Sequence, residues 1–221
     1  MGDNLPAIDL GTGRTAIAIA TGATHNCALL DNHDIKCWGD NYFGQLGLGD
    51  SLPRGDEPGK MGDNLPTVDL GTDFTAVAIA AGDGYTCALS DAGHIKCWGY
   101  NSYGQLGQGD TQWRGSNPGE MGDNLPPIDL GSGNVAVAIA VGDHHTCALL
   151  ASGMIKCWGR NYFGVLGYGD KITRGVSPDQ MGDNLPPVDL GTSRTAIAVE
   201  SGAIATCALL DDGSMKCWGF N

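Results

Sequence analysis

Positive charge, long apolar runs and phosphate-binding motifs are scarce or missing in this sequence. Its 12 Lys and Arg residues stand against 25 Asp and Glu residues, which gives a formal net charge of −13. Because such a chain repels nucleic-acid phosphates and anionic lipids, we expect it to bind neither of them directly. No apolar run reaches the roughly 20 residues that a membrane span needs. No glycine-rich turn carries the Lys-Ser/Thr pair of a phosphate loop.

Helical periodicity and catalytic constellations are also missing. No segment has apolar residues at helical spacing, and neither a Ser-His-Asp order nor a paired-carboxylate site stands out. Glycine, in contrast, is abundant at 36 residues, and apolar residues make up 42% of the chain, which is typical of a folded protein with many tight turns. We therefore expect an all-β protein that is not an enzyme and needs no cofactor.

The chain is a tandem repeat. The hexapeptide MGDNLP begins at Met1, Met61, Met121 and Met181, so the units are residues 1–60, 61–120, 121–180 and a shortened 181–221. A fixed period of this length is the signature of a solenoid, a propeller or an array whose neighbouring units share a core. We expect residues 1–221 to form one repeat domain, and the shortened last unit predicts a segment of a longer protein.

Each unit contains four candidate strands followed by a long connection. In the first unit the candidates are residues 7–10, 15–20, 26–30 and 35–38; the second of them reads TAIAIA, the alternation of a strand. The last two flank a short turn and predict a hairpin. The connection is rich in Gly, Pro, Asn and Asp. Together these features predict propeller blades of four antiparallel strands.

One segment of the repeat is highly specific. The pattern W-G-x-N-x-x-G-x-L-G-x-G-D stands at residues 38–50, 98–110 and 158–170, and the fourth unit begins it at Trp218. With the H-N-C-A-L-L and I-K-C-W-G motifs of the hairpin, it resembles the repeat of the regulator of chromosome condensation family. The resemblance implies four-stranded blades, usually about seven to a closed ring. The units would then belong to a larger propeller, combine with other chains, or form an open or self-closed array.

The same family includes proteins of several functions. One is a guanine-nucleotide exchange factor, whose activity depends on an inserted wedge that has no counterpart in the equal-length connections of this chain. Another is a plant ultraviolet-B receptor, whose tryptophan cluster is not matched by one tryptophan per unit plus Trp113. Many other members are scaffolds.

The eight cysteines fall in pairs, each pair ten residues apart across a hairpin: Cys27–Cys37, Cys87–Cys97, Cys147–Cys157 and Cys207–Cys217. Opposed Cβ atoms of antiparallel strands lie about 4.5–5.5 Å apart, close to disulfide reach. We expect each pair to be a disulfide worth roughly 3 kcal/mol, which indicates an oxidising compartment outside the cell or at its surface. The alternatives are buried free thiols and a zinc site, which the wide spacing disfavours.

Other recurring residues are interpreted structurally. The position of His25 holds Tyr85, His145 and Ala205 in the other units, so no catalytic role is expected there, and we expect His33, His94 and His144 to face solvent. Recurring turn aspartates could bind calcium but more often fix the turn: Asp3, Asp63, Asp123, Asp183, Asp50, Asp110 and Asp170. The recurring arginines are expected to pair with an acidic turn: Arg54, Arg114 and Arg174. The hairpin tryptophans are expected to pack between blades: Trp38, Trp98, Trp158 and Trp218.

The units differ most in the connections. Asp40, Tyr100 and Arg160 share one position of the repeat, and Leu48, Gln108 and Tyr168 share another. Loops on a rigid scaffold usually carry recognition, and an aromatic residue there can anchor an interface. The possible interaction loop therefore consists of Tyr100, Arg160, Trp113 and Tyr168.

Three functions fit these features. The first is a secreted or cell-surface scaffold that binds protein or packs with copies of itself, since unpaired blade faces favour assembly. The second is an intracellular regulator of a small GTPase, of the guanine-nucleotide exchange type. The third is a carbohydrate-binding propeller. Thiol counting on unreduced protein separates the first from the second.

Overall fold

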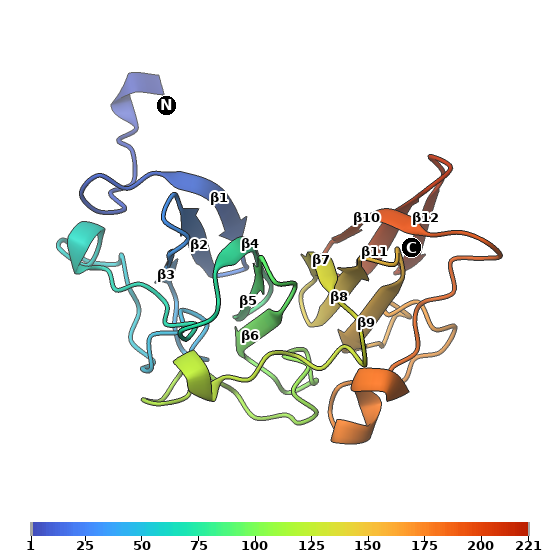
Figure 1. The fold of residues 1–221 in the computed structure, drawn as a ribbon. Helices are drawn as coiled ribbons and strands as arrows, with labels where there is room; N and C mark the ends of the chain where they lie inside the picture. The colour runs from blue at the N-terminus through green and yellow to red at the C-terminus, as the bar shows by residue number, and fades with distance from the viewer. Residues whose placement is uncertain (1, 221) are drawn as a thin grey trace.

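The structure, a computed structural model that describes residues 2–220, consists of four antiparallel sheets of three strands each, side by side in chain order (Figure 1). Every repeat unit contributes one sheet, and within each sheet the strands are ordered as in the chain. The strands are β1 (Ala16–Thr21), β2 (His25–Leu30), β3 (Ile35–Gly39), β4 (Ala76–Ala81), β5 (Tyr85–Ser90), β6 (Ile95–Gly99), β7 (Ala136–Val141), β8 (His145–Leu150), β9 (Ile155–Gly159), β10 (Ala196–Ser201), β11 (Ala205–Leu210) and β12 (Met215–Gly219). The expected all-β class and propeller-type units are confirmed.

The short one-turn helices of the structure are all of the 3₁₀ type. They are η1 (Gly2–Asn4), η2 (Gly62–Asn64), η3 (Gly122–Asn124), η4 (Pro178–Gln180) and η5 (Gly182–Asn184). Four of them lie in the GDN segment that opens each unit. Among the described residues, none of the helices has the length and apolar character needed to cross a membrane.

The prediction of a fourth strand in each unit, at residues 7–10 and their equivalents, is wrong. Residues 7–10 and their equivalents are not strands of their own units. Instead, the equivalent segment of the second unit lies along the last strand of the first sheet, where Val68 N donates to Ile35 O at 2.8 Å. Ile128 and Val188 repeat this bond to Ile95 and Ile155. Proline precedes each segment and has no N–H to donate, so the ladder cannot extend.

A buried lysine strengthens the same junction in each of the first three units. Lys96 Nζ donates to Leu70 O at 2.8 Å and to Gly122 O at 2.9 Å, so one side chain joins the start of its own unit to the start of the next. Lys36 and Lys156 make the same pair of bonds. Asp63 adds a second link, because its carboxylate accepts from Thr12 N at 2.7 Å and from Thr12 Oγ1 at 2.6 Å.

The four expected disulfides are present. The hairpin register places Cys27 directly opposite Cys37, and the same pairing recurs in the other sheets. The S–S distances are 2.09, 2.05, 2.12 and 2.07 Å for Cys27–Cys37, Cys87–Cys97, Cys147–Cys157 and Cys207–Cys217. The three-residue hairpin turn sets this register, so the sequence spacing alone predicted the pairs.

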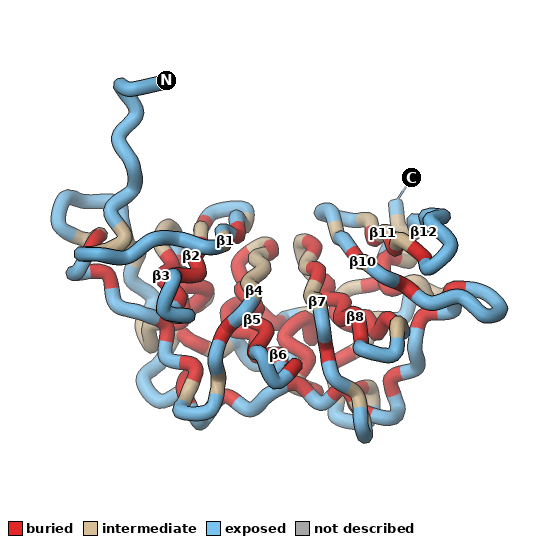
Figure 2. Tube along the Cα trace, turned by 45° about the horizontal axis from the view of Figure 1, so that its top comes forward, coloured by how far each residue is buried: buried red, intermediate tan, exposed pale blue. Residues whose placement is uncertain are grey.

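The core lies between consecutive sheets rather than within any one of them. Neighbouring sheets meet where the first strand of one sheet lies against the first two strands of the sheet before it. Figure 2 shows burial concentrated in the middle sheets, with more exposure at both ends. Ile19 is 72% exposed at the outer face of the first sheet, whereas Val199, at the same position of the repeat, is 4% exposed. Both end sheets therefore present one face without a neighbouring sheet.

Candidate functional site

The candidate site lies where the turn between the first two strands of a sheet meets the start of the long connection. Tyr100 N donates to Gly84 O at 2.9 Å, and Arg160 N donates to His144 O at 2.8 Å, so each unit brings these two loops together. Gly99 makes the turn possible: its φ is +107°, and a Cβ there would lie 2.4 Å from Gly84 O. The chain thereby leaves the strand and turns the next side chain outward.

Aromatic rings from three consecutive units touch one another on this side of the molecule. We call the group the aromatic surface; it consists of Tyr42, Phe43, Tyr100, Tyr103, Trp113, His144 and Tyr162. Phe43 of the first unit contacts two rings of the second unit: the centroid of its ring lies 4.8 Å from that of Tyr100 and 4.8 Å from that of Trp113. Tyr103 continues it, with centroids 6.1 Å from Tyr100 and 5.2 Å from His144. Tyr162 closes the row at 6.4 Å from Tyr103.

These rings remain open to solvent although they contact one another. Tyr42 is 64% exposed, Tyr162 is 54% exposed and Trp113 is 37% exposed. Trp113 Nε1 is held by Ser102 Oγ at 3.4 Å, so the indole keeps a polar tip beside its apolar body. A patch of large, partly exposed aromatic side chains on a rigid scaffold is a typical interaction site.

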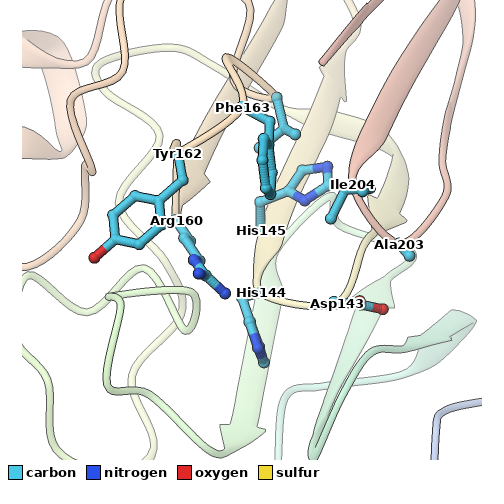
Figure 3. Close-up of a pocket in the computed structure, with 9 residues that line it drawn as sticks. Asp143, His144, His145, Arg160, Tyr162, Phe163, Ala203 and Ile204 are labelled. Atoms are coloured by element: carbon cyan, nitrogen blue, oxygen red, sulfur yellow. The ribbon is translucent and has the colours of Figure 1, made fainter. Parts of the chain in front are cut away.

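Arg160 marks the far end of the aromatic surface. Its guanidinium carbon lies 4.9 Å from the centre of the Tyr103 ring and 4.3 Å from the centre of the Tyr162 ring. Stacking of this kind attracts the cation to the ring faces and fixes the orientation of the planar guanidinium. Arg160 also lines a small pocket, where Figure 3 shows it with Tyr162 on one side and Ile204 with Ala203 across from them.

His144 forms the floor of this pocket and is half-buried, so the prediction that it faces solvent is wrong. Its ring lies between Tyr100 and Tyr103, with Asp83 3.7 Å from its Nε2. Burial lowers the pKa of His144 below its usual range, and the nearby carboxylates of Asp83 and Asp143 oppose that shift only in part. The imidazole is therefore mostly neutral near pH 7.

The structure brings together three of the four residues selected from the variable loops. Tyr100 and Trp113 belong to the aromatic surface, with centroids 5.6 Å apart, and Arg160 lies at its edge. Tyr168 does not join them. Its hydroxyl accepts from Cys157 N and donates to Cys157 O, both at 3.0 Å, and burial raises its pKa to about 12.

Sequence reasoning missed five members of the aromatic surface: Tyr42, Phe43, Tyr103, His144 and Tyr162. The tyrosines and Phe43 follow the Trp-Gly of the hairpin at similar places in each unit. Residues that recur in every unit were interpreted as structural, and the sequence did not show that these side chains are exposed. The sequence signal that could have identified them is their position a few residues from the highly variable position of Tyr100.

The position shared by His25, Tyr85 and His145 is structural. His25 Nε2 lies 2.8 Å from Thr86 Oγ1, and His145 Nε2 lies 2.9 Å from Thr206 Oγ1. Each pair joins consecutive sheets. Burial lowers the pKa of both histidines to about 4, so neither is suited to acid–base chemistry near pH 7. His33 and His94 are exposed, as expected.

The tryptophans also join consecutive units. Trp98 Nε1 and Trp158 Nε1 each donate at 3.0 Å to the carbonyl of Gln45 and Gln105 in the preceding unit. Trp218 Nε1 donates to Val165 O at 2.8 Å. Trp38, which follows no other unit in this chain, is half-buried.

The turn aspartates engage their own surroundings. Asp110 and Arg114 form an ion pair of 2.6 Å, and the equivalent pairs are Arg54–Asp50 at 2.6 Å and Arg174–Asp170 at 2.8 Å. Asp63, Asp123 and Asp183 accept from Thr12, Thr72 and Ser132. These contacts support a turn-fixing role. Within residues 2–220, no group of three or more His, Cys, Asp or Glu side chains is arranged to hold a metal ion.

Comparison with protein families gives a consistent result. The regulator of chromosome condensation (RCC1) repeat matches at residues 16–45, 76–105 and 136–165 in one description of the repeat and at residues 37–89 and 93–149 in another. Together these matches span most of the chain from the first sheet to the connection after the third.

Curated relatives contain the same repeats within longer proteins. The ultraviolet-B receptor UVR8 of Arabidopsis thaliana is 30% identical over 91% of this chain, which covers 40% of that protein. The human E3 ubiquitin-protein ligase HERC2 is 29% identical over 92% of this chain, which covers 4% of that protein. The chain thus spans less than half the length of these relatives.

Solved structures share the fold. Human WBSCR16 superposes with a TM-score of 0.70 at 19% identity, covering 93% of this chain and 47% of that one. Yeast RCC1 (Prp20), solved bound to Kap60, gives a TM-score of 0.69 at 23% identity over 96% of this chain and 45% of that one. The repeat matches and the shared fold show that the chain belongs to the regulator of chromosome condensation repeat family.

Proposed function

We propose that this chain is a non-enzymatic binding module that holds a protein partner on the aromatic surface. The observation that carries the proposal is the continuous contact of partly exposed rings from three units, from Tyr42 to Tyr162. Tyrosine and tryptophan supply large contact areas at a small cost in side-chain entropy, and they are enriched at the centres of interfaces. The structure of a relative bound to Kap60 agrees with a protein-binding role for the fold.

The disulfides support an oxidising location for this module. Three of the four bridges are fully buried between sheets, where they join the strands that carry the core. Bridges of this kind persist in secreted and cell-surface proteins and are rare in the cytosol. We therefore favour a secreted or cell-surface scaffold over an intracellular regulator of a small GTPase. Eight free thiols in unreduced protein would contradict this location.

The binding role can be tested with a displayed library of random linear peptides selected on the whole chain. We expect enriched peptides whose binding quenches the fluorescence of Trp113, the most exposed indole to which a partner would have access. Trp113→Ala should weaken their binding by about tenfold or more, as an interface anchor does. Ile172→Ala, which shortens a 59% exposed side chain on the third connection, is the matched control and should bind normally. Failure to select any peptide, or equal binding by both variants, would reject the proposal.

A carbohydrate ligand is the second candidate, since aromatic faces such as those of Tyr42 and Trp113 also stack on sugar rings. A glycan array probed with the same chain separates the two. Binding to glycans that is lost in Trp113→Ala, without peptide selection, would replace the protein partner by a sugar.

A further inference from the structure

Arg160 differs from every other arginine in the chain. The other five each have a carboxylate within 4 Å: Arg14 pairs with Asp31, Arg54 with Asp50, Arg114 with Asp110, Arg174 with Asp170, and Arg194 with Asp211 and Asp212. Among the described residues, Arg160 has no such partner, although acidic residues outnumber basic ones 25 to 12. An unpaired guanidinium in such an acidic chain needs a specific explanation.

The side chain of Arg160 is held in place without a carboxylate. Tyr103 and Tyr162 fix the guanidinium plane, and its buried Nε has no acceptor among the described residues. A buried donor left without an acceptor costs about 1–3 kcal/mol, so the guanidinium lacks part of its hydrogen bonding where it stands. The Nδ1 of neighbouring His144 is also buried without a hydrogen-bond partner among the described residues.

The pocket beside Arg160 has the size of one side-chain end. Its cavity volume is about 60 Å³, far below the roughly 300–1,000 Å³ of a site for a cofactor or drug-sized molecule. Phe163 and Ile204 form apolar walls, and Phe163 packs against Phe220 with centroids 5.0 Å apart. Phe163 is 42% exposed and Ile204 37% exposed, so a partner that covers these walls would exclude water and strengthen an ion pair formed between them.

Two carboxylates, those of Asp83 and Asp143, lie near the pocket. Asp83 lies 3.7 Å from Nε2 of the mostly neutral His144, and Asp143 lines the pocket; among the described residues, neither forms an ion pair with Arg160. Figure 3 shows Asp143 on the side of His144 away from Tyr162. The guanidinium therefore keeps its charge available toward the aromatic surface, and it would repel a cationic side chain.

We propose that Arg160 receives a carboxylate from an acidic segment of the protein partner, an Asp or Glu side chain whose neighbouring residues pack on Phe163 and Tyr162. The planar fork of arginine matches a carboxylate with two parallel hydrogen bonds. The proposal rests on the protein-binding function of the aromatic surface and adds the chemistry that selects the partner.

The test uses random linear peptides selected in parallel on the wild-type chain and on Arg160→Gln. We expect an Asp or Glu at one position of the wild-type-selected peptides, next to an apolar residue, and its loss from peptides selected on Arg160→Gln. A synthetic peptide of the selected sequence should bind Arg160→Gln about 10- to 100-fold more weakly. Changing the acidic residue of the peptide to its amide should weaken binding to the wild-type chain by a similar factor. The same change should hardly weaken binding to Arg160→Gln any further, because in a double-mutant cycle the two changes remove the same interaction.

Two control variants keep this test interpretable. Arg14→Gln removes the same charge from an exposed arginine of the first unit and should bind normally. Arg160→Lys keeps the charge without the fork and should show an intermediate loss. The thermal midpoint of each variant verifies that it is folded.

Each contrary result has its own meaning. Peptides that require Trp113 but carry no acid, or carry Lys or Arg instead, would reject the carboxylate and leave the binding function standing. Selection of no peptide at all would reject both. Self-association of the wild-type chain that Arg160→Gln abolishes would reject the foreign partner, because the carboxylate would then come from a second copy.

Discussion

His145 Nε2 lies 2.9 Å from Thr206 Oγ1 across the boundary between the third and fourth sheets. His25 makes the same contact with Thr86 at 2.8 Å, and both histidines have a pKa near 4 because burial disfavours the charged ring. In the unfolded chain the pKa returns to its usual value of about 6.5. Between those two values the unfolded state binds more protons than the folded state, so stability must fall as the pH falls.

The first prediction follows from this difference. The free energy of unfolding should drop by an amount on the order of 3 kcal/mol per buried histidine between about pH 6.5 and pH 4. His145→Tyr should reduce the drop, because Tyr85 fills the same place in the second unit and lies 3.1 Å from Thr146 Oγ1 without titrating in this range. Urea unfolding midpoints measured against pH would show it. An unchanged slope in His145→Tyr, or a reduced slope in the exposed His94→Tyr control, would contradict it.

The second prediction concerns the lysines that join consecutive units. Lys96→Met keeps the length of the side chain but removes two charge-assisted bonds to Leu70 O and Gly122 O. Because both carbonyl oxygens lose the hydrogen bond from the lysine, we expect the free energy of unfolding to fall by roughly 2–3 kcal/mol. Lys60→Met, at a half-buried lysine paired with Asp56, should cost much less, because an ion pair open to solvent contributes little to stability. Equal losses in chemical denaturation would contradict the assignment.

The third prediction separates Tyr168 from the aromatic surface. Tyr168→Phe removes a hydroxyl that is bonded to both backbone groups of Cys157, and it should lower stability by about 1–2 kcal/mol. Peptide binding should not change, because the half-buried side chain packs on its own hairpin and has no contact with Tyr100 or Trp113. Trp113→Ala should do the reverse, with weakened binding and little change in the thermal midpoint. A binding defect in Tyr168→Phe would return that residue to the interaction loop.

The fourth prediction concerns the order in which the disulfides are reduced. Cys217 is exposed and Cys207 is half-buried, whereas the other six cysteines are fully buried. Thiol attack requires access to a sulfur atom. In this 221-residue chain, a mild thiol reductant should therefore open Cys207–Cys217 before the other pairs. Alkylation at intervals followed by peptide mass mapping measures the order, and simultaneous reduction of all four pairs would indicate global unfolding instead.

Much of the fold could be predicted from short-range patterns. The strands of the hairpin and the cysteine pairing depend on alternation and on a three-residue turn, and both are visible in residues 25–39. The segment containing Val68 was assigned to the wrong sheet because its partner, Ile35, lies in the preceding unit. Neither alternation nor turn chemistry within one unit carries information about a contact between units.

The candidate site was harder to predict for the same reason. Phe43, Tyr100 and Tyr103 meet although they come from two units, and His144 joins them from a third. Variation between units drew attention to Tyr100, Trp113 and Arg160. Tyr168 varies just as much, but its ring covers the backbone of its own hairpin. Variation identifies positions that are free to change, and only the packing shows which of them reach solvent.

The bond from Val68 to Ile35 has a consequence for how such chains can be cut and rejoined. The hexapeptide at Met61 marks where the amino-acid pattern restarts, yet the first sheet is not complete until the chain has passed Val68. A fragment ending just before Met61 would lack the segment that covers β3, and it would also lose the Gly62 carbonyl that Lys36 holds. Unit exchange, duplication or circular permutation should therefore use breakpoints after Leu70 and its equivalents, where a whole sheet and its covering segment move together.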